Sequence, residues 1–265
     1  MKKAGGFSKA GVIIGVVVVA LICVATYFVI DGNNKATNFD NYNFYSVIPA
    51  DEHNGNIGDH VKTDNDGSYK GEPVLVFEYA DFQCPGCGSM NPRVNQAIDE
   101  LDGKLAVVYR NHLLSYHQNA TAAASAAEAA GLQDPDGSKG YWKKYSDKLF
   151  ANQADWEYKT GSERTAIFEQ YFTEITDGKG DLEKFRKDMS SDAVSKKISF
   201  DMGIGKRITI EGTPAFFVEG QFIPWSNKEG GSVTINGKTI SWESQLSGAE
   251  FVKILKQIVA AKLGE

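Results

Sequence analysis

The feature that most restricts the fold of this chain is a short apolar strand that leads directly into two closely spaced cysteines. Val74-Leu-Val-Phe-Glu-Tyr-Ala80 is rich in β-forming residues and has polar segments on both sides, which is typical of a strand buried on both faces. Cys84-Pro-Gly-Cys87 follows after a short turn, and Pro85 suits the first turn of a helix, where its missing N–H is not needed. The sequence therefore predicts a buried strand, a turn and a helix that starts at Cys84.

The spacing of the two cysteines suits a disulfide that forms and breaks reversibly. On a helix, the β-carbons of residues i and i+3 lie about 5–6 Å apart, which is close to disulfide geometry in both redox states. The free N–H groups and positive dipole of a helix N-terminus favour a thiolate at Cys84. We therefore expect Cys84 to be the attacking sulfur and Cys87 to be the buried resolving thiol.

Two other uses of the cysteine pair remain open at this point. A structural disulfide is disfavoured because closing so small a loop removes little entropy from the unfolded chain. A zinc site would combine the pair with His112 and His117, but the histidine spacing matches no common zinc motif. We expect no metal at the cysteines, with His112 and His117 in a loop or at a helix cap.

A carboxylate and a proline are further candidates for the site. Glu78 lies in the apolar strand, and burial would make its carboxylate harder to ionise, which would fit it to exchange protons with Cys87. The alternative is a side chain that points to solvent, which the two-sided cover of the strand disfavours. Gly212-Thr-Pro214 precedes another short strand at Ala215–Val218, a position where a proline is tolerated.

The rest of the chain alternates between strand and helix patterns. A second buried strand is expected at 105–110, a helical region from 120 to about 207, and a closing amphipathic helix at 251–263. A hairpin is expected at 232–242, where Asn236-Gly237 suits a type I′ turn. This order predicts an α/β fold that carries a helical insertion.

The N-terminal part of the chain carries an uncharged apolar run at residues 11–30. At about 1.5 Å per residue this run would span roughly 30 Å, and it exceeds the usual apolar core of a cleaved signal peptide. Lys2, Lys3 and Lys9 precede it and Asp31 follows it, which predicts a cytoplasmic N-terminus and an extracytoplasmic remainder. The expected organisation is a tail at 1–10, a transmembrane anchor at 11–30, a polar linker at 31–70 and a folded domain at 71–265.

Charge excludes one class of partner. Without the three lysines that precede the apolar run, the chain keeps 25 of its 28 basic residues against 34 acidic ones, a net charge of −9. A surface of this sign repels polyanions. Nucleic acid is therefore a poor candidate ligand.

The sequence resembles the DsbA-like branch of the thioredoxin superfamily through two motifs. These are Phe77-Glu-Tyr-Ala-Asp-Phe-Gln-Cys-Pro-Gly-Cys87 and Gly212-Thr-Pro-Ala-Phe-Phe-Val218, and the likeness extends over roughly residues 73–264. The resemblance implies a thioredoxin-like fold with a helical insertion at about 113–208. It assigns nucleophilic attack to Cys84 and resolution of the mixed disulfide to Cys87. It also implies a cis Thr213–Pro214 bond in a loop that faces the disulfide and holds substrate.

Further implications of the resemblance concern function. Glu78 occupies the position of the family's buried acid, and Pro92 that of a helix-kinking proline. No bound cofactor is implied, because the redox-active disulfide carries the electrons. The implied activity is oxidation of reduced exported proteins, with a membrane quinone-linked enzyme that restores the disulfide.

One departure from the family leaves alternatives open. The best-known oxidase of this branch has a histidine where this chain has Gly86, and that histidine stabilises the thiolate. The chain could therefore work as an isomerase or a reductase kept reduced by a transmembrane donor. A member of another class, a redox-silent module that binds peptides or a metal, is the remaining alternative. Trp142, Tyr145 and Trp156 lie in the helical insertion and could line a peptide groove there, but we expect them in the core.

Overall fold

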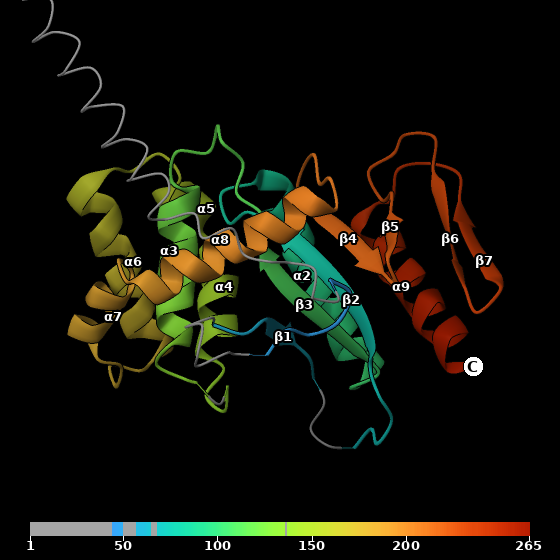
Figure 1. Cartoon of the computed structure of the whole chain (residues 1–265), viewed down its shortest axis with the longest axis horizontal. Helices are drawn as coiled ribbons and strands as arrows, with labels where there is room; N and C mark the ends of the chain where they lie inside the picture. Colours follow the sequence, from blue (N-terminus) through green and yellow to red (C-terminus); the bar gives the residue numbers. More distant parts are fainter. Residues whose placement is uncertain (1–43, 50–56, 65–67, 136) are drawn as a thin grey trace, which may run out of the picture. The chain divides into compact units, whose positions relative to one another are not determined.

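The computed structural model describes residues 44–49, 57–64, 68–135 and 137–265 (Figure 1). The expected cytoplasmic tail and membrane anchor, residues 1–30, lie outside these ranges. Among the described residues, none of the helices combines the length and the apolarity that crossing a membrane requires.

Two parallel strands form the centre of the domain. β2 (Val74–Ala80) pairs with β3 (Leu105–Asn111) in continuous register, from Val74 opposite Leu105 to Ala80 opposite Asn111. Helix α2 (Pro85–Leu101) provides the crossover between them. Almost every residue of both strands is buried, as their apolar composition predicts.

The remaining strands extend the sheet in antiparallel directions, in the order β1-β3-β2-β4-β5. β4 (Ala215–Val218) pairs with β2, and β5 (Gln221–Ile223) pairs with β4. At the other edge, β1 (His60–Lys62) pairs with β3. The expectation that residues 31–70 form only a linker is therefore wrong for residues 60–62, which form β1. A strand of three residues is too short to show an alternating pattern.

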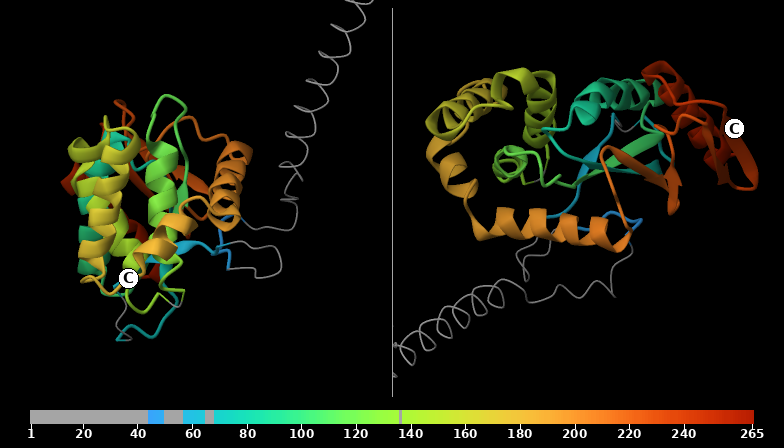
Figure 2. Two further views of the ribbon diagram at one scale, coloured as in Figure 1. Left: turned by 90° about the vertical axis from the view of Figure 1, so that its left-hand side faces the viewer. Right: turned by 90° about the horizontal axis from the view of Figure 1, so that it is seen from above.

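Helices cover both faces of the sheet. α2 and α9 (Gly248–Leu263) pack against one face, and α8 (Asp192–Arg207) lies along the opposite face (Figure 2). A separate hairpin of β6 (Gly231–Ile235) and β7 (Lys238–Trp242) shares the core beside α9. Both residues of its turn, Asn236 and Gly237, have positive φ, as a type I′ turn requires.

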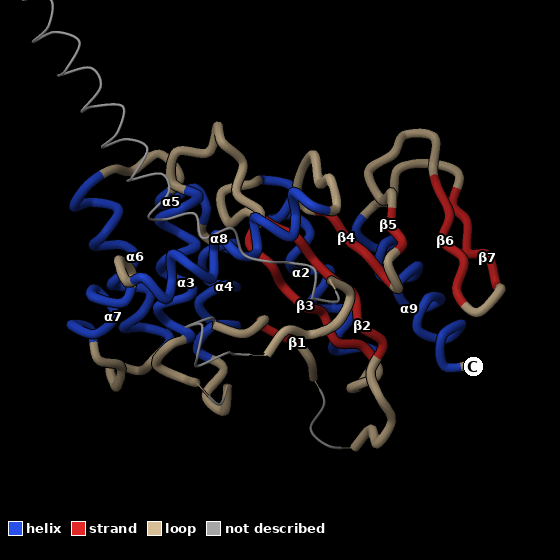
Figure 3. The backbone as a smooth tube through the Cα atoms, in the orientation of Figure 1, coloured by secondary structure: helices blue, strands red, loops and turns tan. Residues whose placement is uncertain are grey.

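A block of helices is inserted between β3 and β4, and all of its members except α8 gather at one end of the sheet (Figures 1 and 3). It consists of α3 (Ala120–Gly131), α4 (Tyr141–Ala151), α5 (Gln153–Trp156), α6 (Gly161–Ile175), α7 (Leu182–Asp188) and α8. The block shares an apolar core with the two cysteines and the neighbouring ends of β2 and β3, and this core includes Trp142, Tyr145 and Trp156, all buried. These aromatic side chains are core residues, as expected, and the insertion has the predicted extent.

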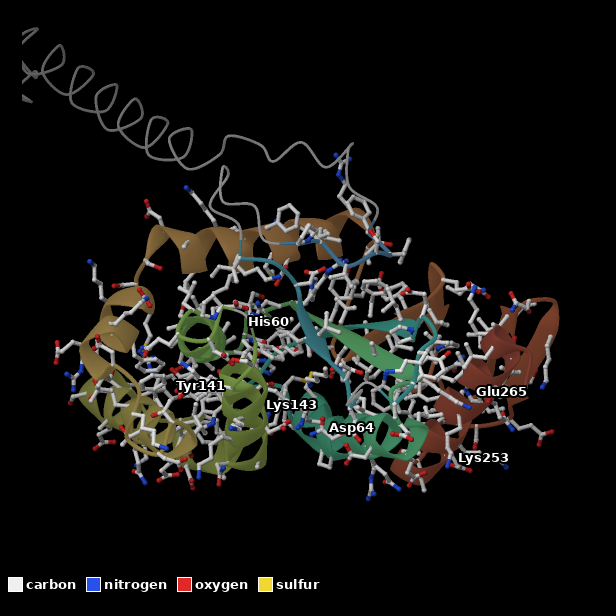
Figure 4. The ribbon with its side chains drawn as sticks, turned by 90° about the horizontal axis from the view of Figure 1, so that it is seen from below. His60, Asp64, Tyr141, Lys143, Lys253 and Glu265 are labelled. Carbon is white, nitrogen blue, oxygen red and sulfur yellow. The ribbon has the colours of Figure 1, made fainter. Side chains whose placement is uncertain are left out.

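A buried ionic network fastens the segment before β2 to the rest of the domain. The Arg110 Nη2 atom lies 2.7 Å from Asp59 Oδ2, and Lys197 Nζ lies 3.2 Å from Asp59 Oδ1 and 2.7 Å from Asp201 Oδ1. His60 Nε2 lies 2.7 Å from Glu128 Oε2, and Figure 4 shows His60 beside the helical insertion. The ion pairs thus join the residue before β1 to both β3 and helix α8.

Candidate active site

The two cysteines lie at the N-terminus of α2, directly after the buried end of β2. Cys84 is the N-cap of the helix and Pro85 occupies its first turn, where a proline loses no hydrogen bond. The Cys84 N–H donates to the Asp81 carbonyl at 3.0 Å, and the Gly88 N–H donates to the Cys84 carbonyl at 3.1 Å. Both cysteines are free thiols; Cys84 is 7% exposed and Cys87 is fully buried.

The two thiols have opposite acidities. A hydrogen bond from the Cys87 thiol does most to lower the pKa of Cys84 to about 5, against the effect of partial burial. The Thr213 side chain and the backbone N–H groups of Cys87 and Gly86 act in the same direction. Burial raises the pKa of Cys87 well above its ordinary value, and its hydrogen bond to Cys84 adds to that rise. Cys84 is therefore the thiolate at neutral pH and Cys87 the protonated partner.

The loop before β4 faces the cysteines, as the resemblance implies. The Thr213–Pro214 bond is cis, and the Thr213 carbonyl oxygen lies 3.3 Å from Cys84 Sγ, where it can accept a proton only from the un-ionised form of the thiol. That carbonyl favours the thiol, whereas the nearby Thr213 hydroxyl favours the thiolate. A β-carbon at Gly86 would lie 3.3 Å from Pro214 Cδ and 3.6 Å from Cys84 Sγ. The glycine thus allows helix, thiol and loop to meet closely.

Glu78 is buried, which agrees with the expected orientation. Its Oε2 atom lies 3.5 Å from Lys62 Nζ, and both side chains have no exposed surface. Lys62 also donates to Asn91 Oδ1 at 3.0 Å, while Glu78 Oε1 has no hydrogen-bond partner among the described residues. The site therefore holds a buried carboxylate with one free oxygen. Proton exchange between Glu78 and Cys87 stays a prediction.

The turn between β2 and α2 is tied to neighbouring loops by side-chain hydrogen bonds. Asp81 accepts from the backbone N–H groups of Gln83 and Leu114, and it bonds His117 Nδ1 at 2.9 Å. The Asp81 side chain is buried and closes the turn ahead of the helix, whose N-cap is Cys84. These bonds fix the approach of the chain to Cys84.

The alternative of a metal site finds no support in the geometry. No group of three or more histidine, cysteine or acidic side chains is arranged to hold a metal ion in the described part of the chain. His117 is engaged with Asp81, and His112 is buried at the end of β3, where its ring lies against α8. Cys84, Cys87 and the two histidines therefore do not form one ligand set.

Some residues of the site were not predicted from the sequence. Lys62 contacts Glu78, and Asn91 contacts Lys62. Neither gave a signal, because Lys62 lies in a polar segment and Asn91 is an ordinary helix residue. Gln153 also contacts the site: its Nε2 atom donates to the carbonyls of Phe82 and Cys84. Side chains that reach the site from distant parts of the chain leave no local pattern.

Fold and site together define a thioredoxin-like protein with a free dithiol at a helix N-terminus and a cis-proline loop facing it. A family model described as thioredoxin matches residues 70–255, which is more than half of the chain. The chain therefore belongs to this thioredoxin family.

Two kinds of curated relative are similar to the chain. The sodium/proton antiporter NhaA 1 of Salinispora arenicola is 32% identical over 149 residues, which make up 56% of this chain and 20% of that protein. The chain thus spans about a fifth of the length of the first curated relatives it matches. The probable disulfide bond formation protein D of Bacillus cereus is 26% identical over 180 residues, covering 66% of this chain and 79% of that protein.

Solved structures share the fold. BdbD from Bacillus subtilis, in its oxidised form, has a TM-score of 0.53 and 19% identity, covering 83% of this chain and 99% of that one. The α-DsbA1 protein of Wolbachia pipientis has a TM-score of 0.53 and 17% identity, covering 82% of this chain and 96% of that one. At these identities the likeness concerns the fold, which is thioredoxin-like with DsbA-like neighbours.

Proposed function

We propose that the protein is a thiol–disulfide oxidoreductase of the DsbA type that introduces disulfide bonds into exported proteins. The observation that carries the proposal is the contrast between the two thiols, an acidic Cys84 near the surface and a buried, protonated Cys87. The similarity to a disulfide bond formation protein over most of that protein's length adds support.

The reaction starts from the oxidised protein, in which Cys84 and Cys87 share a disulfide. A substrate thiolate attacks Cys84 Sγ, the S–S bond breaks, and Cys87 leaves with the electron pair and takes up a proton. A second substrate thiolate then attacks the substrate sulfur of the mixed disulfide and releases Cys84 as a thiolate. The substrate has lost two electrons, and the protein holds them as the dithiol seen here.

The acidity of Cys84 sets the direction of this exchange. A thiol with a pKa of about 5 is a good leaving group, so the second step releases it readily. The reduced protein is stabilised by its thiolate, which makes the disulfide more oxidising. Glu78 and its free oxygen are suited to deliver or accept the proton of Cys87, the group that must change protonation in each cycle.

We further propose that residues 11–30 anchor the protein in a membrane with its catalytic domain outside the cytoplasm. The support is the uncharged run of 20 residues and the lysines before it. Reduced exported proteins would be the substrates, and a membrane quinone-linked enzyme would restore the disulfide. Two of the most exposed large side chains, Tyr116 and Tyr158, lie on loops bonded to the turn before Cys84 and would contact a substrate chain.

A second candidate function rests on Gly86. Without a side chain at this position, the thiolate lacks one means of stabilisation that the family's best-known oxidase has. An isomerase or reductase, kept reduced by a transmembrane donor, would use the same site with electrons flowing the other way.

The test is the redox equilibrium of the full chain with glutathione, read by quantifying the free thiols of Cys84 and Cys87. A potential of about −120 to −150 mV would support the oxidase, whereas a value near −250 mV or below would favour the reductase. Cys84→Ala should abolish exchange, and Cys87→Ala should accumulate mixed disulfides with substrate. A Cys84→Ala protein that still exchanged thiols would contradict both functions.

A further inference from the structure

A side chain of the helical insertion reaches the backbone of the nucleophilic cysteine. Gln153, the first residue of α5, donates from Nε2 to the Cys84 carbonyl at 2.9 Å and to the Phe82 carbonyl at 2.7 Å. These contacts join residues 69 and 71 positions apart in the sequence. The Gln153 amide therefore bonds the backbone on both sides of Gln83, the residue that precedes Cys84.

The helix that carries the cysteines leaves room for this amide. A β-carbon at Gly88 would lie 2.4 Å from Gln153 Oε1 and 2.8 Å from its Cδ atom, much closer than atoms can approach. Gly88 lies in a helix, where alanine would be the more stable residue. Gly88 does not adopt a positive φ, so its backbone conformation does not require glycine. The close approach of the Gln153 side chain does.

The position of the Cys84 backbone matters for the thiolate. The N–H groups of Gly86 and Cys87 stabilise the sulfur only if the first turn of α2 keeps its orientation toward Sγ. The Cys84 carbonyl is part of that turn, since it accepts from the Gly88 N–H. A second donor on the same carbonyl restrains its rotation and adds partial positive charge near the sulfur.

Other links between the insertion and this turn end elsewhere. The Gln83 side chain donates to the Glu157 carbonyl at 2.9 Å and accepts from the Asn119 N–H at 2.6 Å. These bonds hold the neighbouring loops to Gln83 and do not involve the Cys84 carbonyl. The bonds of Gln83 thus attach the insertion to the turn, whereas the bond of Gln153 restrains the Cys84 carbonyl.

We propose that Gln153 is a positioning residue, held in a recess provided by Gly88, that keeps Cys84 in the orientation in which its thiolate is stabilised. The inference rests on the thiol chemistry of the proposed function but not on the direction of electron flow. It makes the helical insertion a determinant of Cys84 reactivity in addition to a cover for the site.

The test compares the reduced full chain with Gln153→Ala, Gly88→Ala and the double variant. The measurement is the rate of Cys84 alkylation by iodoacetamide as a function of pH, with Cys87 protected by its burial. Gln153→Ala should shift the Cys84 titration upward and slow alkylation by about three- to tenfold near pH 4, below the Cys84 pKa of about 5, as expected for one lost hydrogen bond. Gly88→Ala should act in the same direction, because its methyl group displaces the Gln153 amide.

The double variant distinguishes this role from simple destabilisation. Once Gln153 is alanine, a methyl group at Gly88 meets no amide, so the double variant should react like Gln153→Ala alone. Asn152→Ala serves as the matched control. It removes a neighbouring amide that donates to the Lys148 carbonyl within the insertion, and it should leave the titration unchanged.

Either of two results would overturn the proposal. One is an unchanged Cys84 titration in both single variants, and the other is full additivity of their effects in the double variant. Gly88→Ala adds a helix-favouring residue, so it keeps the test decisive even if Gln153→Ala loses stability. If the glutathione equilibrium gave a strongly negative potential for the Cys84–Cys87 pair but the alkylation pattern were as expected, the oxidase function would be rejected and the role of Gln153 would stand.

Discussion

Replacing Lys62 by methionine should destabilise the domain strongly, although this residue lies in an edge strand of three residues. Lys62 and Glu78 have no exposed surface, and Lys62 Nζ lies 3.5 Å from the Glu78 carboxylate. Its ammonium group also lies 5.4 Å from the centre of the Tyr109 ring. The methionine side chain fills a similar volume but leaves Glu78 as a buried carboxylate without a cation.

The expected magnitude follows from the burial of both partners. Removing one member of a buried ion pair typically costs about 3–5 kcal/mol, because the remaining charge is desolvated without compensation. Replacing both members by apolar side chains of similar size is often close to neutral. Lys62→Met should therefore lower the free energy of unfolding by about 3 kcal/mol or more, and adding Glu78→Met should restore most of that loss.

The assay is urea unfolding of the reduced full chain at pH 7, followed by circular dichroism. Lys104→Met is the control, because Lys104 and Glu265 form a partly exposed pair that should contribute about 0–1 kcal/mol. A loss below about 1 kcal/mol in Lys62→Met would show that Glu78 does not depend on this cation. A double variant that loses the sum of both single effects would contradict the coupling itself.

Two other predictions concern the site. The absorbance of the reduced protein at 240 nm should titrate with a pKa of about 5 for Cys84. Because folding lowers this pKa, the thiolate stabilises the folded reduced protein. The stabilisation is complete above the ordinary pKa of a cysteine and is lost as the pH falls to about 5. At pH 7 it should be on the order of 1–2 kcal/mol after allowance for partial exposure. Glu78→Gln should slow disulfide exchange without unfolding the domain, and normal turnover of this variant from about pH 5 to 9 would remove Glu78 from proton transfer.

The sequence predicts those parts of the fold that rest on local pattern. The two central strands, the helix that begins beside Cys84, the strand after Pro214 and the hairpin turn at Asn236 all appear where apolar runs and turn residues place them. The boundaries of the helical insertion agree as well, because its first helix is an alanine-rich run with high helix propensity. The burial of Glu78 was inferred from the two-sided cover of its strand.

The remaining features depend on contacts between distant residues. β1 lies in a polar segment, and its pairing with β3 is visible only once the sheet exists. The match to the family model begins at residue 70, after β1, so the family pattern does not supply this strand either. Lys62 and Gln153 reach the site through single side chains, and single side chains produce no periodic signal.

The buried ionic network has a consequence for the order in which a newly made chain can fold. Lys197 and Asp59 are 138 residues apart, and β2 obtains its second neighbour only when β4 has been made. Because a chain is synthesised from its N-terminus, Asp59 stays without Lys197 and the Cys84–Cys87 helix stays uncovered until most of the chain has been made. We expect folding to be a late event that follows release of the whole domain, with the sheet closing last around residues made early.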